Sequence, residues 1–340
     1  MILRPFKLTN DSEFTIYSEV DYSWFENLIL GRNTVIISDA NVFNLYPDLI
    51  KKYKNIILDS DKNLKNIDTI LDIIKKLVEY NIDRNSLLIG VGGGVICDIV
   101  GFVSSIYMRG INFGFIPTTL LAQIDASIGG KNGINFGDLK NYIGTISQPE
   151  FIICDTNFLK SLSEQEFKSG LGEVLKCSLI GEYDLFEMIS NENNFGNKDQ
   201  RFDFLNPVVR SCICTKIKIV QQDIIDKNYR HVLNFGHTFG HCFEVVENIP
   251  HGIAVVKGMI VALDISLKYS YLEKDVYEKI LQIFGNFDFD LSYKLTDKHF
   301  ELLSKDKKKN GDNIDFVFLK DIGEPHIAKV KIEELMKAVS

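Results

Sequence analysis

The sequence lacks an uninterrupted apolar run long enough to cross a membrane. Its most apolar stretch, residues 87–108, is broken by three successive glycines and by Asp98, so it does not predict a transmembrane helix. The first residues, MILRPFKLTND, contain no apolar core of the kind that secretory signals have. These absences predict a cytoplasmic protein with no membrane partner.

Paired cysteines are also missing. The six cysteines are scattered, none belongs to a C-x-x-C pair, and a chain of 340 residues is too long to depend on a disulfide scaffold. We therefore expect free thiols in a reducing compartment.

An excess of positive charge is absent too. The formal net charge is −8, which argues against a nucleic-acid partner. A small anionic substrate stays compatible with this charge if cationic side chains gather locally. The length corresponds to about two domains.

Short apolar runs alternate with helical patterns in the first half of the chain. The runs at residues 34–37, 55–58, 86–90, 113–116 and 151–154 predict buried strands, and residues 67–78 have helical spacing. Such alternation is typical of a parallel, doubly wound sheet. It predicts a Rossmann-like α/β domain over residues 1–160.

Helical patterns dominate the second half. They cover residues 164–179, 208–223, 239–246, 254–269 and 276–284. We therefore expect a second, mostly α-helical domain over residues 161–340.

The strand predicted at residues 86–90 runs into Gly92, Gly93 and Gly94 and then into a helix. Glycines let a ligand approach the backbone closely, and the N-terminus of a helix favours a phosphate. The standard dinucleotide fingerprint is not present, because Val95 stands where its last glycine belongs. A tight structural turn and a phosphate cradle both fit this pattern.

A second group of glycines lies at residues 129–130, followed by Lys131 and then by Lys140 and Asn141. Lysines beside glycine-rich backbone suit anionic oxygens. Spacing alone favours a solvated loop here.

Three of the six histidines fall close together. His237 and His241 are four residues apart, on one face of the predicted helix, and His251 follows Pro250 at the start of the next helix. Two such imidazoles and a carboxylate from elsewhere would bind a divalent metal and leave a position open. The helical metalloprotease motif is absent, because Thr238 occupies the position of its glutamate.

Seven motifs, taken in order, resemble the successive signatures of the 3-dehydroquinate synthase family. They are GGGVICD (92–98), YMRG (107–110), PTTLLAQID (117–125), GGK (129–131), KN (140–141), GLGEVLK (170–176) and LNFGHTFGH (233–241). The resemblance implies an NAD-binding Rossmann-like domain, a helical domain that binds zinc or cobalt, and a homodimer. It also implies a reaction of the shikimate pathway: 3-deoxy-D-arabino-heptulosonate 7-phosphate would give 3-dehydroquinate and phosphate. The implied steps are transient oxidation by NAD, phosphate elimination, reduction and an internal aldol closure.

The resemblance also assigns roles to individual residues. The metal ligands would be Glu173, His237 and His251. The NAD site would be formed by Asp39, Lys65, Gly93, Gly94, Asp98, Thr118, Thr119, Lys140 and Ser161. The substrate phosphate would be held by Lys131, Asn141, Arg230, Asn234 and Lys307 or Lys308, with Arg109 from a second subunit. Lys176 and Lys216 would contact the substrate carboxylate and hydroxyls, Asp125 would orient the lysines, and His241 would transfer the proton.

Related sugar-phosphate cyclases share this architecture. Those that make deoxy-inosose or valiolone rings typically carry an acidic residue in place of Asn234, and valiolone cyclases lack His241. Metal-dependent polyol dehydrogenases lack the Gly-Gly-Lys and Lys-Asn segments.

The sequence also departs from the family pattern at two places. Ile253 stands where a glutamate usually follows His251-Gly252, so we expect a carboxylate beside the metal to be missing. The usual Asp-Glu-Arg-Glu run reads Asp-Ile-Ile-Asp at residues 223–226. A catalytically impaired binding protein on the same fold is therefore an alternative.

Overall fold

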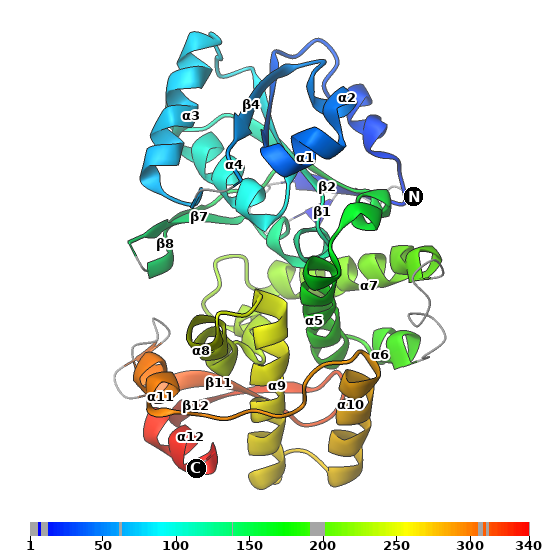
Figure 1. Cartoon of the computed structure of the whole chain (residues 1–340), viewed down its shortest axis with the longest axis vertical. Helices are drawn as coiled ribbons and strands as arrows, with labels where there is room; N and C mark the ends of the chain where they lie inside the picture. The colour runs from blue at the N-terminus through cyan, green and yellow to red at the C-terminus, as the bar shows by residue number, and fades with distance from the viewer. Residues whose placement is uncertain are drawn as a thin grey trace. The chain divides into compact units, whose positions relative to one another are not determined.

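The computed structural model describes residues 6–7, 13–60, 63–137, 139–190, 201–304, 309–310 and 313–339. The chain divides into an N-terminal unit, Met1–Leu162, and a C-terminal unit, Ser163–Ser340 (Figure 1). The division expected from the sequence, between residues 160 and 161, lies close to this point.

Within its described residues, the N-terminal unit contains a seven-stranded sheet in the order β1-β2-β9-β6-β5-β3-β4. All neighbours pair in parallel except β1, which is antiparallel to β2. This confirms the predicted parallel α/β sheet. The strands are β1 (Phe6–Lys7), β2 (Glu13–Ser18), β3 (Thr34–Asp39), β4 (Lys54–Leu58), β5 (Leu87–Gly92), β6 (Asn112–Pro117) and β9 (Phe151–Cys154).

Helices cover both faces of this sheet. Leu87, Ile89 and Val91 of β5 belong to one apolar cluster with residues of α1 (Ala40–Leu45) and α2 (Pro47–Ile50). Gly90 faces the other way, and a Cβ there would lie 3.2 Å from the side chain of Val100 in α4 (Gly94–Ile106). Because successive strand residues point to opposite faces, α1 and α2 lie on one side and α4 on the other.

The helix predicted at residues 67–78 is α3 (Ile67–Glu79). It begins where the side chain of Asn66 accepts the backbone N–H of Thr69, which satisfies one of the N–H groups left unpaired in the first turn. It buries Ile70, Ile73 and Leu77, which lie on one helical face. The apolar periodicity therefore predicted the helix. It did not predict the whole buried face, because Ile67, Leu71 and Val78 of the same pattern are exposed and Ile73 is buried.

The strand order places a switch point between β3 and β5. The chain moves outward from β3 to β4, then returns to place β5 on the other side of β3 and β6 beyond it. In open parallel sheets, ligands bind in the crevice at the carboxyl ends of such strands. Asp39 ends β3 and Gly92 ends β5, so the glycine turn lies at this crevice.

The second glycine cluster is not a solvated loop, as spacing alone had favoured. Ser127, Ile128, Gly129 and Gly130 are buried, after the π-helix η3 (Ala122–Ala126). They lead into a hairpin of β7 (Lys131–Phe136) and β8 (Leu139–Ile146), which packs against α4. The prediction was wrong because this segment pairs with residues further along the chain, which local spacing does not show.

The C-terminal unit is mostly helical, as predicted. Its described helices are α5 (Glu164–Ile180), α6 (Tyr183–Ser190), α7 (Arg201–Gln222), α8 (His237–Glu247), α9 (His251–Lys268), α10 (Lys274–Asn286), α11 (Asp297–Ser304) and α12 (Ile332–Val339). The unit also contains an antiparallel sheet that the sequence did not predict, formed by β10 (Lys309–Asn310), β11 (Asn313–Leu319) and β12 (Pro325–Lys331).

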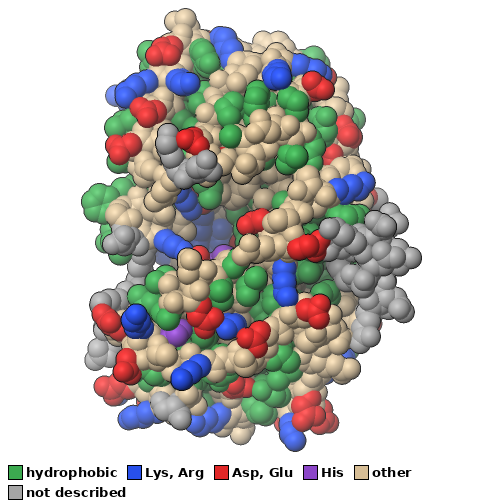
Figure 2. All heavy atoms as spheres, in the orientation of Figure 1, with side chains coloured by type: hydrophobic (Ala, Val, Ile, Leu, Met, Phe, Trp, Pro, Cys, Tyr) green, Lys and Arg blue, Asp and Glu red, His purple; other side chains and the backbone are tan. Residues whose placement is uncertain are grey.

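Acidic and basic side chains are interspersed over the face shown in Figure 2. They do not form a broad patch of one sign on that face. Among the described helices, none combines the length and the apolar content that crossing a bilayer requires.

Candidate active site

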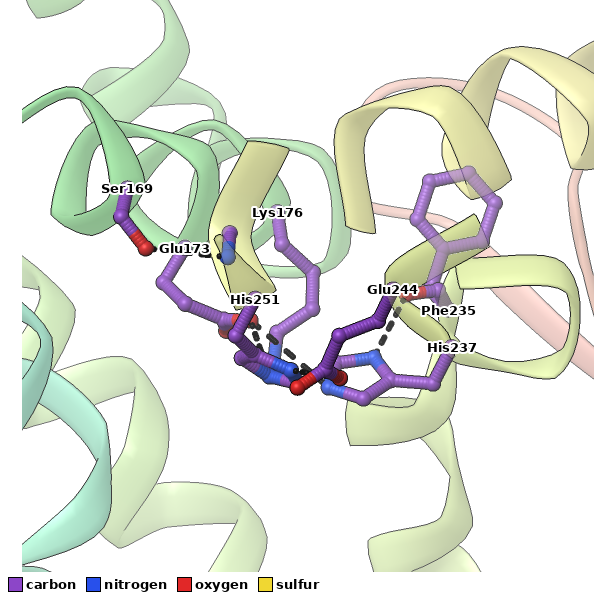
Figure 3. Close-up of polar contacts among 8 residues, drawn as sticks. Ser169, Glu173, Lys176, Phe235, His237, Glu244 and His251 are labelled. Carbon is purple, nitrogen blue, oxygen red and sulfur yellow. Dashed lines mark hydrogen bonds and ion pairs between the residues drawn. The ribbon is translucent and has the colours of Figure 1, made fainter. Parts of the chain in front are cut away.

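Glu173, His237 and His251 converge in the C-terminal unit from three different helices, α5, α8 and α9. One ligand atom from each lies within 4.8 Å of the others. The Nε2 atoms of both histidines are 3.6 Å from Oε1 of Glu173. Figure 3 shows the three side chains pointing toward one another.

Glycines beside two of these residues explain how the helices come so close. A Cβ at Gly252 would lie 1.7 Å from the carbonyl oxygen of Ser169, and one at Gly172 would lie 2.2 Å from the carbonyl oxygen of Gly252. The N–H of Gly252 donates to Oγ of Ser169 at 3.0 Å. The backbones of α5 and α9 therefore touch next to Glu173 and His251, which places the carboxylate against the imidazole.

His237 and His251 are each oriented by an acceptor at Nδ1. Nδ1 of His237 lies 3.1 Å from the carbonyl oxygen of Phe235, and Nδ1 of His251 lies 3.0 Å from Oε2 of Glu244. A proton on each Nδ1 makes these contacts hydrogen bonds and leaves Nε2 with a lone pair toward Glu173.

Glu244 corrects the expectation drawn from Ile253. A carboxylate beside the cluster is present, and it comes from α8 instead of the residue after Gly252. Burial alone would lower the pKa of His251, but the hydrogen bond to Glu244 and the charge of Glu173 outweigh it and raise this pKa above its ordinary value.

The environment of Glu173 fits a bound cation. The side chain is fully buried, and its Oε2 forms an ion pair with the Lys176 ammonium. Oε1, which faces the two imidazoles, accepts no hydrogen bond from the residues that the structure describes. A buried carboxylate with lone pairs left over, facing two imidazole nitrogens, is a chemically suitable ligand set for a divalent metal.

Other predicted residues of the C-terminal unit fall near this cluster or on neighbouring elements. The ring of His241 lies 5.4 Å from that of His237 and 6.0 Å from that of His251, measured between centroids. Lys216 is buried in α7, and Arg230 is buried in the 3-10 helix η6 (Tyr229–Asn234), which ends at Asn234. Lys307 and Lys308 lie outside the described residues.

Asp223 shapes the loop that leads to Arg230. Its carboxylate accepts the backbone N–H groups of Lys227 at 3.1 Å, Asn228 at 2.6 Å and Arg230 at 3.2 Å. Burial acts to raise the pKa of Asp223, but these hydrogen bonds outweigh it and lower the pKa. The first acid of the altered acidic run therefore has a clear structural role.

Five of the predicted cofactor residues, Asp39, Gly93, Gly94, Thr118 and Thr119, lie at the carboxyl ends of neighbouring strands in the N-terminal unit. Asp39 ends β3 and caps α1 by accepting the N–H groups of Asn41 and Val42. Gly93 caps α4, and a Cβ there would meet Thr119 at 3.2 Å. Thr118, next to Thr119, ties β6 to β5 by donating its N–H to Gly92. The N-terminus of α4 therefore lies at the carboxyl ends of β5 and β6, where its backbone N–H groups can bind a phosphate.

Lys65 links two elements of the same unit, α4 and β8. Its Nζ lies 2.5 Å from Oδ2 of Asp98 in α4 and also donates to Oδ1 of Asn141 in β8. Burial raises the pKa of Asp98, and the Lys65 ammonium offsets part of that rise. The charge of Asp125 acts in the same direction as burial, which places this second acid nearby.

The remaining predicted residues occupy separate positions. Lys131 and Lys140 are exposed on the β7–β8 hairpin. Ser161 ends the 3-10 helix η4 (Thr156–Ser161), and its hydroxyl accepts the Tyr46 hydroxyl at 2.9 Å. Arg109 is exposed in a turn with φ of 67°, between two other residues with positive φ.

Comparisons with known proteins agree with this arrangement. Residues 55–169 match the family model for the 3-dehydroquinate synthase N-terminal region, and residues 170–309 match the one for its C-terminal region. A 3-dehydroquinate synthase of Clostridium tetani is 38% identical over 353 residues, covering 99% of this chain and 94% of that protein. One of Helicobacter pylori is 39% identical over 323 residues, covering 91% of this chain and 92% of that protein.

The chain belongs to the 3-dehydroquinate synthase family. It is thus an enzyme of a lyase family. The fold is also similar to that of other cyclases, including a 2-deoxy-scyllo-inosose synthase solved with carbaglucose-6-phosphate, NAD+ and Co2+. That structure has a TM-score of 0.86 and 23% identity, with 100% of this chain and 99% of that chain covered. A 2-epi-5-epi-valiolone synthase with NAD+ and Zn2+ bound gives the same TM-score, 0.86, and the same identity, 23%, with 99% of this chain and 98% of that chain covered.

Proposed function

We propose that this enzyme converts 3-deoxy-D-arabino-heptulosonate 7-phosphate to 3-dehydroquinate and phosphate. The buried Glu173 carboxylate facing two imidazole nitrogens, in a chain of this family, is the observation that carries the proposal. Asn234 and His241 support this substrate over those of the inosose and valiolone cyclases, because both match the dehydroquinate type. The proposal includes a cytoplasmic location and a role in aromatic amino acid biosynthesis.

The metal site consists of Glu173, His237 and His251, and zinc and cobalt both suit it. When bound, such an ion supplies Lewis acidity to substrate hydroxyls. The chain's own contribution is orientation: Glu244 and the Phe235 carbonyl fix the two imidazoles, and the contact of α5 with α9 fixes the carboxylate.

The NAD site lies at the switch point of the N-terminal sheet. Gly93 and Gly94 open α4 without a Cβ in the way, so the helix N-terminus is available to the pyrophosphate. When bound, NAD supplies a hydride acceptor that is regenerated in each turnover. The other residues of this site are Asp39, Lys65, Asp98, Thr118, Thr119, Lys140 and Ser161.

The substrate is held by cationic and amide side chains. Lys131, Asn141, Arg230 and Asn234 bind the phosphate, helped by Lys307 or Lys308, and Lys176 and Lys216 bind the carboxylate and hydroxyls. His241 transfers the proton, since it lies beside the ligand histidines and an imidazole titrates near neutral pH. Asp125 orients the lysines. Holding one conformer and stabilising charge in this way are how such a site accelerates the reaction.

A homodimer completes the site in this proposal, with Arg109 reaching the phosphate of the partner subunit. The turn that carries it is exposed and has an unusual backbone: Met108, Arg109 and Gly110 all have positive φ, and Met108 is exposed despite its apolar side chain. Strained backbone of this kind is found at ligand clamps. In Figure 2, hydrophobic side chains also reach the surface at the left, where Figure 1 places the β7–β8 hairpin.

The test is turnover of 3-deoxy-D-arabino-heptulosonate 7-phosphate by the purified enzyme with NAD and zinc. Phosphate should be released while the absorbance of reduced nicotinamide stays flat, because NAD is needed and not consumed. Stoichiometric accumulation of NADH would instead indicate a polyol dehydrogenase. Metal analysis of His251→Ala should show a loss of bound metal, and unchanged content would contradict the ligand assignment.

A second candidate is another sugar-phosphate cyclase, since the fold matches two of them with a TM-score of 0.86. A panel of hexose and heptulose phosphates, scored by phosphate release, separates the two candidates. A catalytically impaired binding protein loses its main support, because Glu244 supplies the carboxylate that Ile253 does not. Binding of NAD and metal without phosphate release from any of these substrates would restore that alternative.

A further inference from the structure

The β7–β8 hairpin contains an irregularity beside two residues of the proposed site. The ladder is interrupted between the pairs Ile134–Ile143 and Phe136–Leu139. Across this interval β7 contributes one residue, Asn135, and β8 contributes three, residues 140–142. A bulge of this kind bends the strand and re-aims its side chains, and such bulges are frequent next to active sites.

At the bulge, the side chain of Asn135 accepts a hydrogen bond from the backbone of the opposite strand. Its Oδ1 accepts the backbone N–H of Asn141 at 3.0 Å. Asn141 has a φ of 50°, a left-handed conformation that is uncommon for residues with a Cβ, although asparagine adopts it more readily than most. Asn135 therefore fixes the backbone from which the Asn141 side chain projects.

The backbone of Asn135 holds a second residue of the site. Its N–H donates to the carbonyl oxygen of Lys65 at 2.8 Å. The Lys65 ammonium in turn contacts Oδ1 of Asn141 and lies 2.5 Å from Oδ2 of Asp98. Asn135, Lys65 and Asn141 thus form a closed set of contacts, with Asp98 as its link to α4.

The base of the hairpin is fixed independently of this set. Nδ2 of Asn132 donates to the carbonyl oxygens of Gly130 at 2.8 Å and Ser147 at 2.9 Å. Phe136, beyond the bulge, and Tyr142, within it, are exposed. Asn135 therefore lies between the anchored base of the hairpin and its exposed tip, at the bulge that contains Asn141.

We propose that Asn135 is a positioning residue that holds Asn141 against the substrate phosphate and joins it to the cofactor residue Lys65. This inference rests on the proposed function, which supplies the roles of Asn141 and Lys65. Replacing the side chain removes the acceptor for the Asn141 N–H but keeps the backbone contact to Lys65. The substitution should thus affect substrate binding more than NAD binding.

The experiment compares Asn135→Ala and Asn135→Asp with the unsubstituted enzyme. In the alanine variant, the KM for the sugar phosphate should rise roughly three- to tenfold, the range expected for one lost hydrogen bond. The kcat and the Kd for NAD should each change less than about twofold. The lost interaction stabilises the bound substrate and the transition state equally, so its loss raises KM and leaves kcat nearly unchanged. Asn135→Asp keeps an acceptor oxygen, so its KM should return toward the unsubstituted value at an ionic strength that screens the added charge.

Asn27→Ala is the matched control, since Asn27 is an exposed asparagine of the same unit whose side chain donates to the Trp24 carbonyl. It should leave the KM unchanged. A KM for Asn135→Ala within twofold of the unsubstituted enzyme overturns the proposal. So does a rise that Asn135→Asp does not reverse, because that rise would not come from the missing acceptor.

A second readout does not depend on activity. Amide hydrogen exchange of Asn141 should be faster in Asn135→Ala and restored in Asn135→Asp. If the unsubstituted enzyme releases no phosphate from any sugar phosphate, the proposed function fails, and the exchange rates still test the contact. Equal exchange at Asn141 in the alanine variant and the unsubstituted enzyme refutes the positioning role itself.

Discussion

Glu244 places a carboxylate oxygen 3.0 Å from Nδ1 of His251, in a chain where Ile253 occupies the usual position of a glutamate. Glu244 lies on α8 and His251 opens α9, so the contact spans the turn between the two helices. That turn includes Asn248, whose φ of 51° ends α8 in a left-handed conformation. The imidazole is thus oriented from the neighbouring helix.

The first prediction is that Glu244→Ala weakens metal binding. Partners that orient a ligand imidazole are typically worth about 10- to 100-fold in metal affinity. Glu244→Gln should lose less, because an amide oxygen can still accept the Nδ1 proton. Zinc affinity, measured by chelator competition, is the readout, with Glu247→Gln as the control because Glu247 pairs with Lys257 instead. Equal affinities for all of these proteins would mean that Glu244 does not orient His251.

The second prediction concerns the contact between α5 and α9. Gly252→Ala places a Cβ where the carbonyl oxygen of Ser169 would be 1.7 Å away, so the helices must separate beside Glu173 and His251. We expect a loss of stability of at least about 1–3 kcal/mol, the cost of overpacking, together with weaker metal binding.

Gly285→Ala is its control. Gly285 also lies within a helix, α10, but the nearest atom to an added Cβ is a side-chain carbon of Leu291 at 3.8 Å. Alanine is the better helix former, so this variant should be at least as stable as the unsubstituted enzyme. Thermal unfolding and metal titration of both variants are the measurements. A Gly252→Ala protein with unchanged stability and metal affinity would show that the helices are not in close contact.

The histidine cluster shows what the sequence could and could not predict. The four-residue spacing of His237 and His241 placed both on one helix, and Pro250 marked the start of α9 at His251. The carboxylate ligand came from a resemblance, because Glu173 lies on a helix far away in the chain and spacing carries no such information. The roles of Glu244 and Asn135 were not predicted. The contact of Glu244 depends on the turn between α8 and α9, and that of Asn135 depends on the bulge in the β7–β8 hairpin.

The antiparallel sheet of the C-terminal unit was missed for a similar reason. β12 carries Lys329 and Lys331 among its alternating residues, and Asp315 of β11 pairs with Lys329. These charged residues make the segment resemble a solvated one until the pairing of the strands is known. Five of the parallel strands were predictable because their apolar runs are nearly continuous, as in strands buried on both faces. β2, which is parallel to β9, was not predicted, and its burial alternates along the strand.

The third prediction is a pH-dependent contribution of Asp223 to stability. Its pKa is lowered in the folded protein by the backbone N–H groups of Lys227, Asn228 and Arg230, although burial acts against this. A lowered folded pKa means that the stabilisation is fully present above the unfolded pKa and is lost as the pH falls through the folded one. Asp223→Asn should therefore cost about 1–3 kcal/mol near neutral pH.

The measurement is the free energy of unfolding of both proteins as a function of pH. The difference between them should be constant near neutrality and shrink as the pH falls below the ordinary carboxyl range, about 4. Glu278→Gln, which removes one end of an exposed pair with Lys274, should change stability little at any pH. A difference for Asp223→Asn that does not shrink in acid would mean that its charge is not what holds the loop.

The last prediction tests the shared site. Arg109 projects from a left-handed turn after α4, and Lys131 opens β7. In the proposed homodimer, Arg109 of one subunit and Lys131 of the other bind the same phosphate. Each charge-assisted hydrogen bond is worth roughly 1.5–3 kcal/mol, so Arg109→Ala and Lys131→Ala should each lower kcat/KM about tenfold or more.

Mixing the two variants should restore part of the activity, because one site of a hybrid dimer then contains both unsubstituted residues. The other site lacks both, so the hybrid cannot exceed half of the unsubstituted activity per dimer, and a statistical mixture contains about half hybrids. Subunit exchange is verified first, by native mass spectrometry of differently tagged chains. If verified hybrids are no more active than the two parent variants, Arg109 does not act on the partner's phosphate site, and a role within its own subunit replaces this one.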